Sequence, residues 1–257
     1  MLSCLLLLAV LSNLKPLSVS PFNGTWLTDL SASKENREPE VYRLKDGMFS
    51  RGTGPSSVTV KADGHYHKMT GGSYVDEIAV VDLGRNGVRE TDRLAGKTVY
   101  VVEYQVSAGR DALTVKATDF SKPDGRPIPY TFRYQRVGLP NASESALTGR
   151  WRQVAVQATR ASMIDKVTLL GDRFSLRAPS GYGYEAVIGG PPVRVDGDIG
   201  MVAVSMPDER TIVMRSTIEG KPTVTATWRM LPSNAAIQVT ARLQGSRTDS
   251  KWVMRRQ

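Results

Sequence analysis

Histidine and cysteine are scarce in this sequence, which holds two histidines and one cysteine among 257 residues. Cys4 lies in the apolar leader, so a chain that has lost the leader has no disulfide and no thiol nucleophile. Two histidines leave few parts for a Ser–His–Asp triad, and the sequence contains neither a G-x-S-x-G elbow nor a phosphate-binding loop. We therefore expect no enzyme and no cofactor, although an activity based on carboxylates stays open.

The two histidines, His65 and His67, are separated by one residue in the stretch DGHYHK. On a strand this spacing puts both imidazoles on one face, where a metal can bind, and Asp63 or Asp76 would have to supply a third ligand. The neighbouring Asp-Gly turn signal favours a surface hairpin instead, and the matching stretch of the second half, GGPPV, has no histidine. We predict no metal site.

Long apolar runs are also missing, so we do not expect the chain to span a membrane. The short run Leu5–Leu11 is typical of the core of a secretory signal. We assign residues 1–20 to a signal peptide, expect at least residues 1–12 to be removed, and place the mature protein in the periplasm or outside the cell. No basic residue precedes the run, and a mis-started gene is the alternative explanation. Cys4 precedes the run, whereas a lipoprotein cysteine follows it, so lipidation is disfavoured.

Positive charge is in excess, with a net charge of +9 and a pI near 9.7. Residues 21–138 carry 17 basic and 15 acidic side chains, net +2, whereas residues 147–257 carry 16 and 9, net +7. The arginines are scattered singly along alternating segments, with no basic tract and no zinc-finger or helix-turn-helix spacing, so we expect no nucleic-acid partner. An anionic component of the cell envelope is a possible partner for the basic second half.

The sequence is a tandem duplication. An offset of 125 places Trp26 of FNGTW on Trp151 of LTGRW, and Phe49 on Phe174. After one deletion, an offset of 124 aligns EIAVVD (77–82) with MVAVSM (201–206) and LAGKTVYVVEYQV (94–106) with IEGKPTVTATWRM (218–230). Near the end, YQR (134–136) matches VMR (253–255). We predict two domains, copy 1 (residues 21–138) and copy 2 (residues 146–257), joined by a linker at residues 139–145.

Each copy is predicted to be all-β. Apolar and polar residues alternate with a period of two along segments such as 223–230, and turn signals such as AGK and EGK separate these segments. We expect nine or ten antiparallel strands per copy in an up-and-down meander. A meander of this length closes into a barrel because closure removes the unpaired edges.

The Gly-x-Trp at the start of each meander resembles the lipocalin and fatty-acid-binding (calycin) superfamily. The opening FNGTW and the DG and GK turns are more closely similar to uncharacterised secreted bacterial proteins with lipocalin-like repeats. The resemblance implies that Trp26 and Trp151 pack across the closed end of the barrel of their own copy. It also implies that Gly24 and Gly149 allow close approach of backbone. The sequence departs from the lipocalin pattern in having no disulfide and no Thr-Asp-Tyr motif.

Two acidic residues occupy positions that the alternation assigns to the barrel interior. Glu90 and Asp92 share a face with Val88 and Leu94, and their counterparts in copy 2 are Met214 and Ser216. A carboxylate inside a barrel is costly unless it is paired or solvated, which favours a polar ligand anchor or an acid–base pair. The alternatives are that this strand end lies at the open rim, or that a bulge reverses the register.

Aromatic residues share the predicted inner face of copy 1, at positions 100, 104, 130, 132 and 134. They suit a cavity for an apolar ring or chain, and they equally suit a filled core. We predict that Glu90, Asp92, Tyr100, Tyr104 and Phe132 contact a ligand. The leading hypothesis is an exported, non-enzymatic protein that holds a small amphipathic or hydrophobic ligand in the barrel of copy 1. The alternative is a structural or interaction module of the envelope with filled barrels, which presents the basic surface of copy 2.

Overall fold

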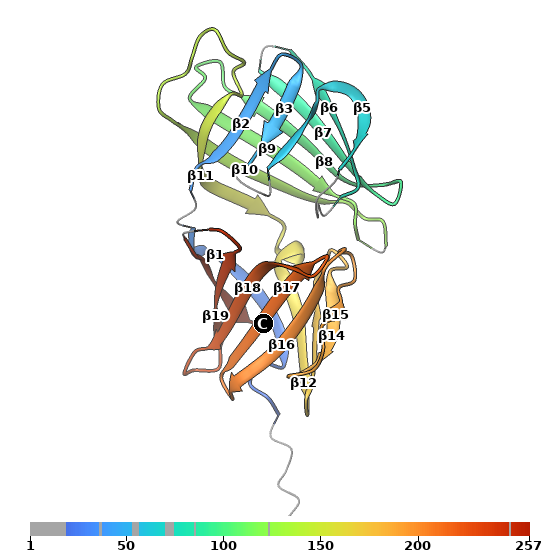
Figure 1. Cartoon of the computed structure of the whole chain (residues 1–257). Helices are drawn as coiled ribbons and strands as arrows, with labels where there is room; N and C mark the ends of the chain where they lie inside the picture. The colour runs from blue at the N-terminus through green and yellow to red at the C-terminus, as the bar shows by residue number, and fades with distance from the viewer. Residues whose placement is uncertain are drawn as a thin grey trace, which may run out of the picture.

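The computed structural model describes residues 19–35, 38–52, 57–69, 75–84, 86–122, 124–246 and 248–257. The predicted signal peptide therefore lies almost wholly outside the described residues. The described chain is all-β, as predicted, and forms two antiparallel sheets of ten strands that are each nearly closed into a barrel (Figure 1). Its one helical element in these ranges is the short 3₁₀ helix η2 (Arg160–Met163). No helix in the described residues is long and apolar enough to cross a membrane.

The first sheet, barrel 1, runs in the order β4-β3-β2-β11-β10-β9-β8-β7-β6-β5. Its strands are β2 (Glu40–Lys45), β3 (Met48–Arg51), β4 (Val58–Lys61), β5 (Asp63–Lys68), β6 (Glu77–Asp82), β7 (Gly87–Leu94), β8 (Lys97–Val106), β9 (Ala112–Asp119), β10 (Ile128–Val137) and β11 (Gly149–Ala158).

The second sheet, barrel 2, runs in the order β14-β13-β12-β1-β20-β19-β18-β17-β16-β15. Its strands are β1 (Gly24–Glu35), β12 (Ile164–Leu170), β13 (Arg173–Arg177), β14 (Gly183–Val187), β15 (Val193–Arg194), β16 (Met201–Asp208), β17 (Thr211–Ile218), β18 (Lys221–Met230), β19 (Ala236–Leu243) and β20 (Ser250–Arg256). A single bridge between Gly183 and Asp196 joins the two ends of this sheet.

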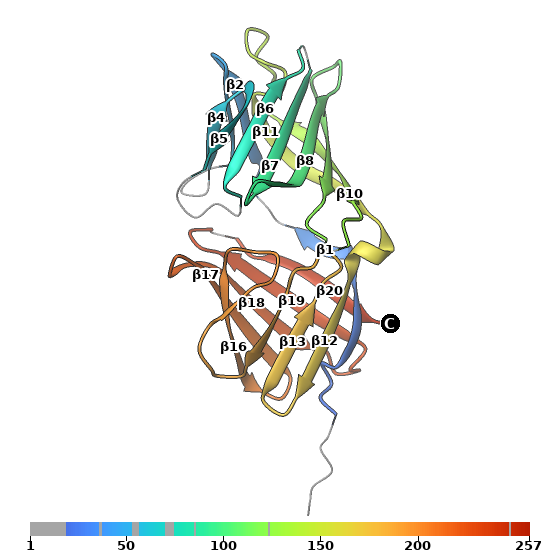
Figure 2. The ribbon, with the colours of Figure 1, turned by 90° about the vertical axis from the view of Figure 1, so that its right-hand side faces the viewer.

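The two copies exchange their first strands. β1 pairs with β12 and β20, although it opens copy 1, and β11 pairs with β2 and β10, although it opens copy 2. We predicted from the sequence that each Gly-x-Trp strand belongs to the sheet of its own copy, and this prediction is wrong. Residues 139–145 are therefore a loop between two neighbouring strands of barrel 1. The chain crosses between the barrels elsewhere, after β1 and through η2 (Figures 1 and 2).

Matched side chains hold the exchanged strands. Asn23, next to β1, donates from its Nδ2 to the Leu169 carbonyl at 3.1 Å and accepts from the Leu169 amide through its Oδ1. Thr148, next to β11, accepts from the Leu44 amide at 3.0 Å and donates to the Leu44 carbonyl at 3.3 Å. Both pairs of residues are related by the offset of 125. The duplicated sequence thus encodes the same anchor twice, and each anchor fastens a strand to the other copy's sheet.

The tryptophans are fully buried, and an arginine covers each of them. The guanidinium carbon of Arg256 lies 4.3 Å from the ring centroid of Trp26, and that of Arg136 lies 4.0 Å from the ring centroid of Trp151. This geometry pairs Arg136 with Arg256, so the alignment of YQR with VMR is wrong by one residue.

The same arginines explain the glycine of each Gly-x-Trp. Gly24 has φ +145° and Gly149 has φ +149°. A Cβ at Gly24 would lie 2.6 Å from the Arg256 Nη1, and one at Gly149 would collide with the Arg136 guanidinium. Each glycine thus makes room for an arginine side chain. The resemblance had implied instead that the glycine lets another backbone segment approach.

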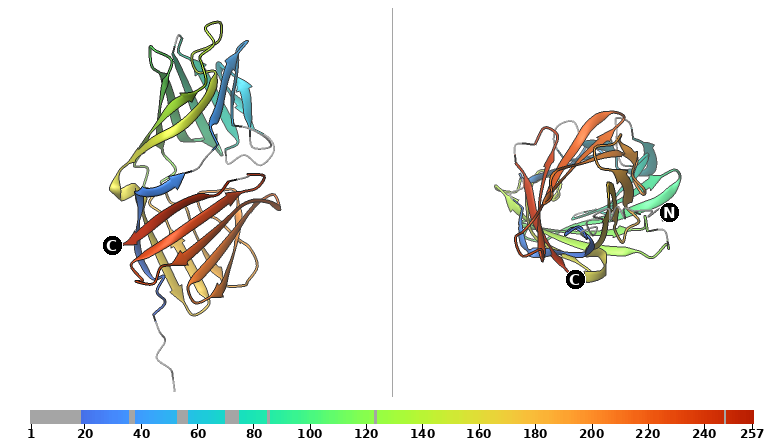
Figure 3. Two further views of the ribbon diagram at one scale, coloured as in Figure 1. Left: turned by 90° about the vertical axis from the view of Figure 1, so that its left-hand side faces the viewer. Right: turned by 90° about the horizontal axis from the view of Figure 1, so that it is seen from below.

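The barrels meet end to end. β1 enters barrel 2 at the end remote from barrel 1 and runs towards barrel 1, and β11 runs from the remote end of barrel 1 to the same junction (Figures 1 and 3). The Gly-x-Trp ends therefore point away from each other, and the opposite ends of the two barrels face each other. A hydrogen bond of 3.3 Å from the Ser121 hydroxyl to the Ser180 carbonyl spans the junction.

Candidate functional site

Two carboxylates are buried inside barrel 1. Glu90 and Asp92 lie on β7 with 0 % and 4 % of their surface exposed. The irregularity that interrupts the pairing of β7 with β8 falls after Asp92, so it does not turn either side chain outward. Both residues therefore occupy the interior that the alternation predicted, rather than an exposed rim or the outer face.

Arg51 at the end of β3 reaches these carboxylates. Its Nε and Nη2 each lie 2.9 Å from the Glu90 Oε1, and its Nη2 lies 4.0 Å from the Asp92 Oδ2. The Tyr104 hydroxyl donates to the Glu90 Oε2 at 2.6 Å. We call Arg51, Glu90, Asp92 and Tyr104 the interior cluster. Arg51 is not among the residues predicted from the sequence, although it follows Phe49 by two residues and therefore shares its inner face.

Burial and charge set the protonation of the interior cluster. Burial, reinforced by the neighbouring Glu90 carboxylate, raises the pKa of Asp92 to about 8. Burial lowers the pKa of Arg51, but Glu90, Tyr104 and Asp92 together outweigh this effect and leave that pKa raised. At neutral pH the cluster therefore holds an Arg51–Glu90 ion pair beside a mostly protonated Asp92. The buried Asp92 Oδ1 has no hydrogen-bond partner among the described residues.

Aromatic rings line the remote side of the interior cluster. Tyr42 lies 5.3 Å from Tyr104 and 6.4 Å from Tyr134, centroid to centroid, and both contacts are edge-on. Phe49 lies 5.6 Å from Tyr104. These side chains belong to the buried core of barrel 1, which also contains Trp151. This part of the interior is packed with side chains.

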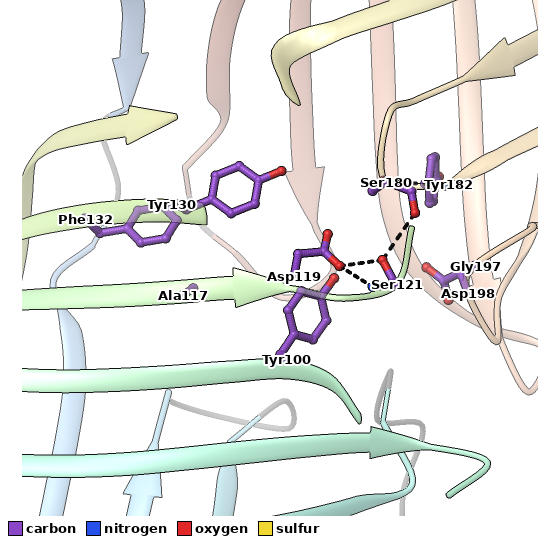
Figure 4. Close-up of a pocket in the computed structure, with 10 residues that line it drawn as sticks. All are labelled: Tyr100, Ala117, Asp119, Ser121, Tyr130, Phe132, Ser180, Tyr182, Gly197 and Asp198. Atoms are coloured by element: carbon purple, nitrogen blue, oxygen red, sulfur yellow. Dashed lines mark hydrogen bonds between the residues drawn. The ribbon is translucent and has the colours of Figure 1, made fainter. Parts of the chain in front are cut away.

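A pocket of about 490 Å³ lies at the junction of the two barrels (Figure 4). Barrel 1 contributes six of its lining residues, from β8, β9, β10 and the segment after β9: Tyr100, Ala117, Asp119, Ser121, Tyr130 and Phe132. Loops of barrel 2 contribute the others: Ser180, Tyr182, Gly197 and Asp198. We call this space the junction pocket. It is the mouth of barrel 1, and barrel 2 covers it.

The strand register connects the junction pocket to the interior cluster. Asp92 on β7 is the partner of Tyr100 on β8, and Tyr100 is the partner of Asp119 on β9. Neighbours in adjacent strands project to the same face of a sheet, so the three side chains form one row across the inner wall. The row runs from a buried acid, past a phenol, to the acid that lines the pocket.

Asp119 is the buried acid of the junction pocket, with 3 % of its surface exposed. Its Oδ1 accepts from the backbone amide of Ser121 at 2.8 Å and from the hydroxyl of Ser121 at 2.5 Å. Tyr130 and Phe132 lie nearly parallel on β10, with ring centroids 6.3 Å apart. Figure 4 shows the Tyr130 ring next to Asp119 and the Phe132 ring beyond it, with Ser180 and Tyr182 on the other side of Asp119.

The predicted site residues thus fall into two neighbouring groups. Glu90, Asp92 and Tyr104 belong to the interior cluster, whereas Tyr100 and Phe132 line the junction pocket. The prediction from the sequence did not include Asp119, Ser121 or the residues from barrel 2, although the alternation of Leu113, Val115 and Ala117 extends to Asp119. Their part in the pocket depends on how the barrels meet, which no period within one copy reveals.

The histidine pair lies outside both groups. His67 Nε2 is 2.8 Å from the Asp63 Oδ1 at the exposed strand β5. Within the described ranges, no group of three His, Cys, Asp or Glu side chains could hold a metal ion. The pair lies on an exposed edge strand, as a surface position requires, but the Asp-Gly step is not a hairpin turn, because β5 pairs with β6 and not with β4.

Comparison with known proteins leaves this architecture without a match: no model of a protein family, no curated protein and no solved structure matches the chain.

Proposed function

We propose that the chain is an exported, non-enzymatic binding protein that holds a small amphipathic ligand in the junction pocket, at the mouth of barrel 1. The observation that carries the proposal is the composition of this pocket, which combines aromatic rings with a few polar groups in about 490 Å³. Pockets for small molecules are commonly of this size and commonly apolar with a few orienting polar groups. Export rests on the apolar run Leu5–Leu11 alone.

The interior cluster supports a ligand rather than a purely structural role. A buried ion pair contributes little net stability compared with well-packed apolar residues, and barrel 2 has apolar or small residues at the same positions. The row of Asp92, Tyr100 and Asp119 leads from this cluster to the junction pocket. A ligand donor that reached inward along this row would satisfy the buried Asp92 Oδ1.

The alternative is a structural module with filled barrels that presents the basic surface of copy 2 to an anionic envelope component. The specific observation in its favour is the dense apolar core of each barrel, where large side chains such as Trp26, Phe174 and Ile237 are fully buried. In this alternative the junction pocket is only a gap between two packed ends.

Retention of a ligand separates the two functions. Native mass spectrometry of the full chain, purified without detergent, should show an added mass under the binding hypothesis. In parallel, the full chain should bind the neutral fluorophore N-phenylnaphthylamine, and Ala117→Trp should weaken that binding by about tenfold or more because the indole fills the pocket.

Ala241→Trp is the matched control for this substitution. Ala241 occupies the corresponding inner position of β19 and does not line the junction pocket. The Ala241→Trp variant should therefore bind the fluorophore as tightly as the native chain. No retained mass together with no fluorophore binding would reject the proposal and favour the structural alternative.

A further inference from the structure

From the charge and ring content of the junction pocket, we infer that its ligand is an organic cation: a protonated amine or quaternary ammonium that carries an apolar group. The inference rests on the proposed function and adds the chemical class of the ligand. Four rings, from Tyr100, Tyr130, Phe132 and Tyr182, line the pocket together with two carboxylates, Asp119 and Asp198.

The lining of the pocket is acidic in a basic protein. The chain has a net charge of +9, yet none of the residues that line the junction pocket is a lysine, arginine or histidine. Among the described residues, no basic side chain forms an ion pair with Asp119 or Asp198. An anionic ligand would therefore meet two carboxylates and no compensating cation, whereas a cationic ligand would meet favourable charge on both sides of the junction.

Asp119 in particular lacks a counter-charge. It is almost fully buried, and the amide and hydroxyl of Ser121, which donate to its Oδ1, are neutral. A buried carboxylate is costly unless a cation pairs with it. A ligand ammonium beside Asp119 would supply the missing charge, and the Ser121 bonds already fix where that charge must sit.

The rings add a second preference for a cation. The faces of tyrosine and phenylalanine rings attract ammonium groups, most strongly where water is excluded. Tyr130 and Phe132 both line the pocket, and their rings stand nearly parallel with an interplanar angle of 21°. Tyr182 faces the pocket from barrel 2, as Figure 4 shows. Both barrels thus contribute an aromatic ring and a carboxylate to a pocket that suits an ammonium group with an apolar substituent.

Three probes of one shape test the charge preference: phenylpropylamine, phenylpropanol and phenylpropanoate, which are cationic, neutral and anionic at neutral pH. Isothermal titration calorimetry of the full chain should give the amine a Kd about tenfold or more below that of the alcohol, and the carboxylate should bind most weakly. Asp119→Asn should abolish most of the preference for the amine while binding of the alcohol changes less than about twofold. The asparagine Oδ1 can still accept from the Ser121 amide, so the local turn is kept.

Asp124→Asn is the matched control. Asp124 accepts from the amide of Arg126 in the same kind of turn, lies close in sequence, and does not line the pocket. The Asp124→Asn substitution removes the same charge as Asp119→Asn and should leave the preference for the amine intact. Equal affinity for the amine and the alcohol, unaffected by Asp119→Asn, would overturn the cation assignment and leave the proposed function standing. Failure of all three probes and of N-phenylnaphthylamine to bind would overturn both.

Discussion

Equivalent positions inside the two barrels carry opposite chemistry. Barrel 1 has Arg51, Glu90, Asp92 and Tyr104 where barrel 2 has Leu176, Met214, Ser216 and Trp228. The register confirms the equivalence, because Glu90 is the partner of Val102 as Met214 is of Ala226, and Val88 is the partner of Tyr104 as Ile212 is of Trp228. Barrel 2 demonstrates that this sheet closes around apolar side chains. The ions of barrel 1 are therefore not a requirement of the fold.

The exchange of first strands makes a second comparison possible. Trp26 and Trp151 are equivalent in sequence, and each is the buried anchor of the other copy's sheet. A substitution at either position should therefore act on the barrel formed mainly by the opposite copy.

Trp26→Ala and Trp151→Ala should each lower the free energy of unfolding by about 3–5 kcal/mol, since each removes a fully buried ring. The location of the loss tests the strand exchange. Hydrogen exchange followed by mass spectrometry should speed up in β12 and β20 after Trp26→Ala, and in β2 and β10 after Trp151→Ala. Faster exchange in the barrel of the substituted residue's own copy would contradict the exchange.

Replacing Arg51 alone should be nearly as damaging. Arg51→Leu copies the residue of barrel 2 but leaves the buried Glu90 without its cation. Because a third of the Arg51 side chain is exposed and water can partly replace it, the loss should be about 2–4 kcal/mol. The triple variant Arg51→Leu, Glu90→Met, Asp92→Ser copies all three positions of barrel 2. Its stability in urea denaturation should equal or exceed that of the native chain, because no buried charge remains. A triple variant less stable than Arg51→Leu would mean that the cluster is a structural requirement of barrel 1.

The next difference between the barrels is a smaller one: the buried Asp92 of barrel 1 should make the free energy of unfolding depend on pH. The pKa of Asp92, about 8 in the fold, exceeds the ordinary value of 3.8, so the folded state binds this proton more tightly than the unfolded state. The penalty for burying the carboxylate is therefore absent below pH 4, grows as the pH rises, and is complete above pH 8. Between pH 6 and pH 8 this penalty should grow by about 2 kcal/mol.

Asp92→Asn should remove that part of the pH dependence and stabilise the chain more at pH 8 than at pH 6. Another acid with a raised pKa remains in barrel 2, where burial raises the pKa of the half-buried Asp165 to about 7. The slope of stability against pH should thus be reduced by Asp92→Asn and not abolished. An unchanged slope would mean that Asp92 is solvated in the folded chain.

The limits of sequence reasoning follow from particular residues. The period of two and the repeated Gly-x-Trp were sufficient for the all-β class, the two ten-stranded sheets and the inward direction of Glu90 and Asp92. They could not reveal the exchange of β1 and β11, because the two segments share their glycine, tryptophan and apolar pattern and so fit either sheet. Arg51 was detectable through its equivalence to the buried Leu176. The inward direction of Asp119 was detectable from the alternation of its strand, but its place in the junction pocket was not, because that depends on contact between the barrels.

The smallest expected difference concerns two tyrosine hydroxyls that are equally close to their partners. The Tyr104 hydroxyl lies 2.6 Å from the Glu90 Oε2 in barrel 1, and the Tyr184 hydroxyl lies 2.6 Å from the Met214 Sδ in barrel 2. A hydrogen bond to a charged acceptor is worth about 1.5–3 kcal/mol, whereas a thioether sulfur is a weak acceptor. Tyr104→Phe should therefore lower the free energy of unfolding by about 1.5 kcal/mol, and Tyr184→Phe by less than about 0.5 kcal/mol. Both substitutions remove one oxygen and keep the ring, so urea denaturation of the two variants compares the acceptors directly. Equal losses would mean that Glu90 is not the charged acceptor in barrel 1, and the contrast between the two interiors would then lie in packing rather than in charge.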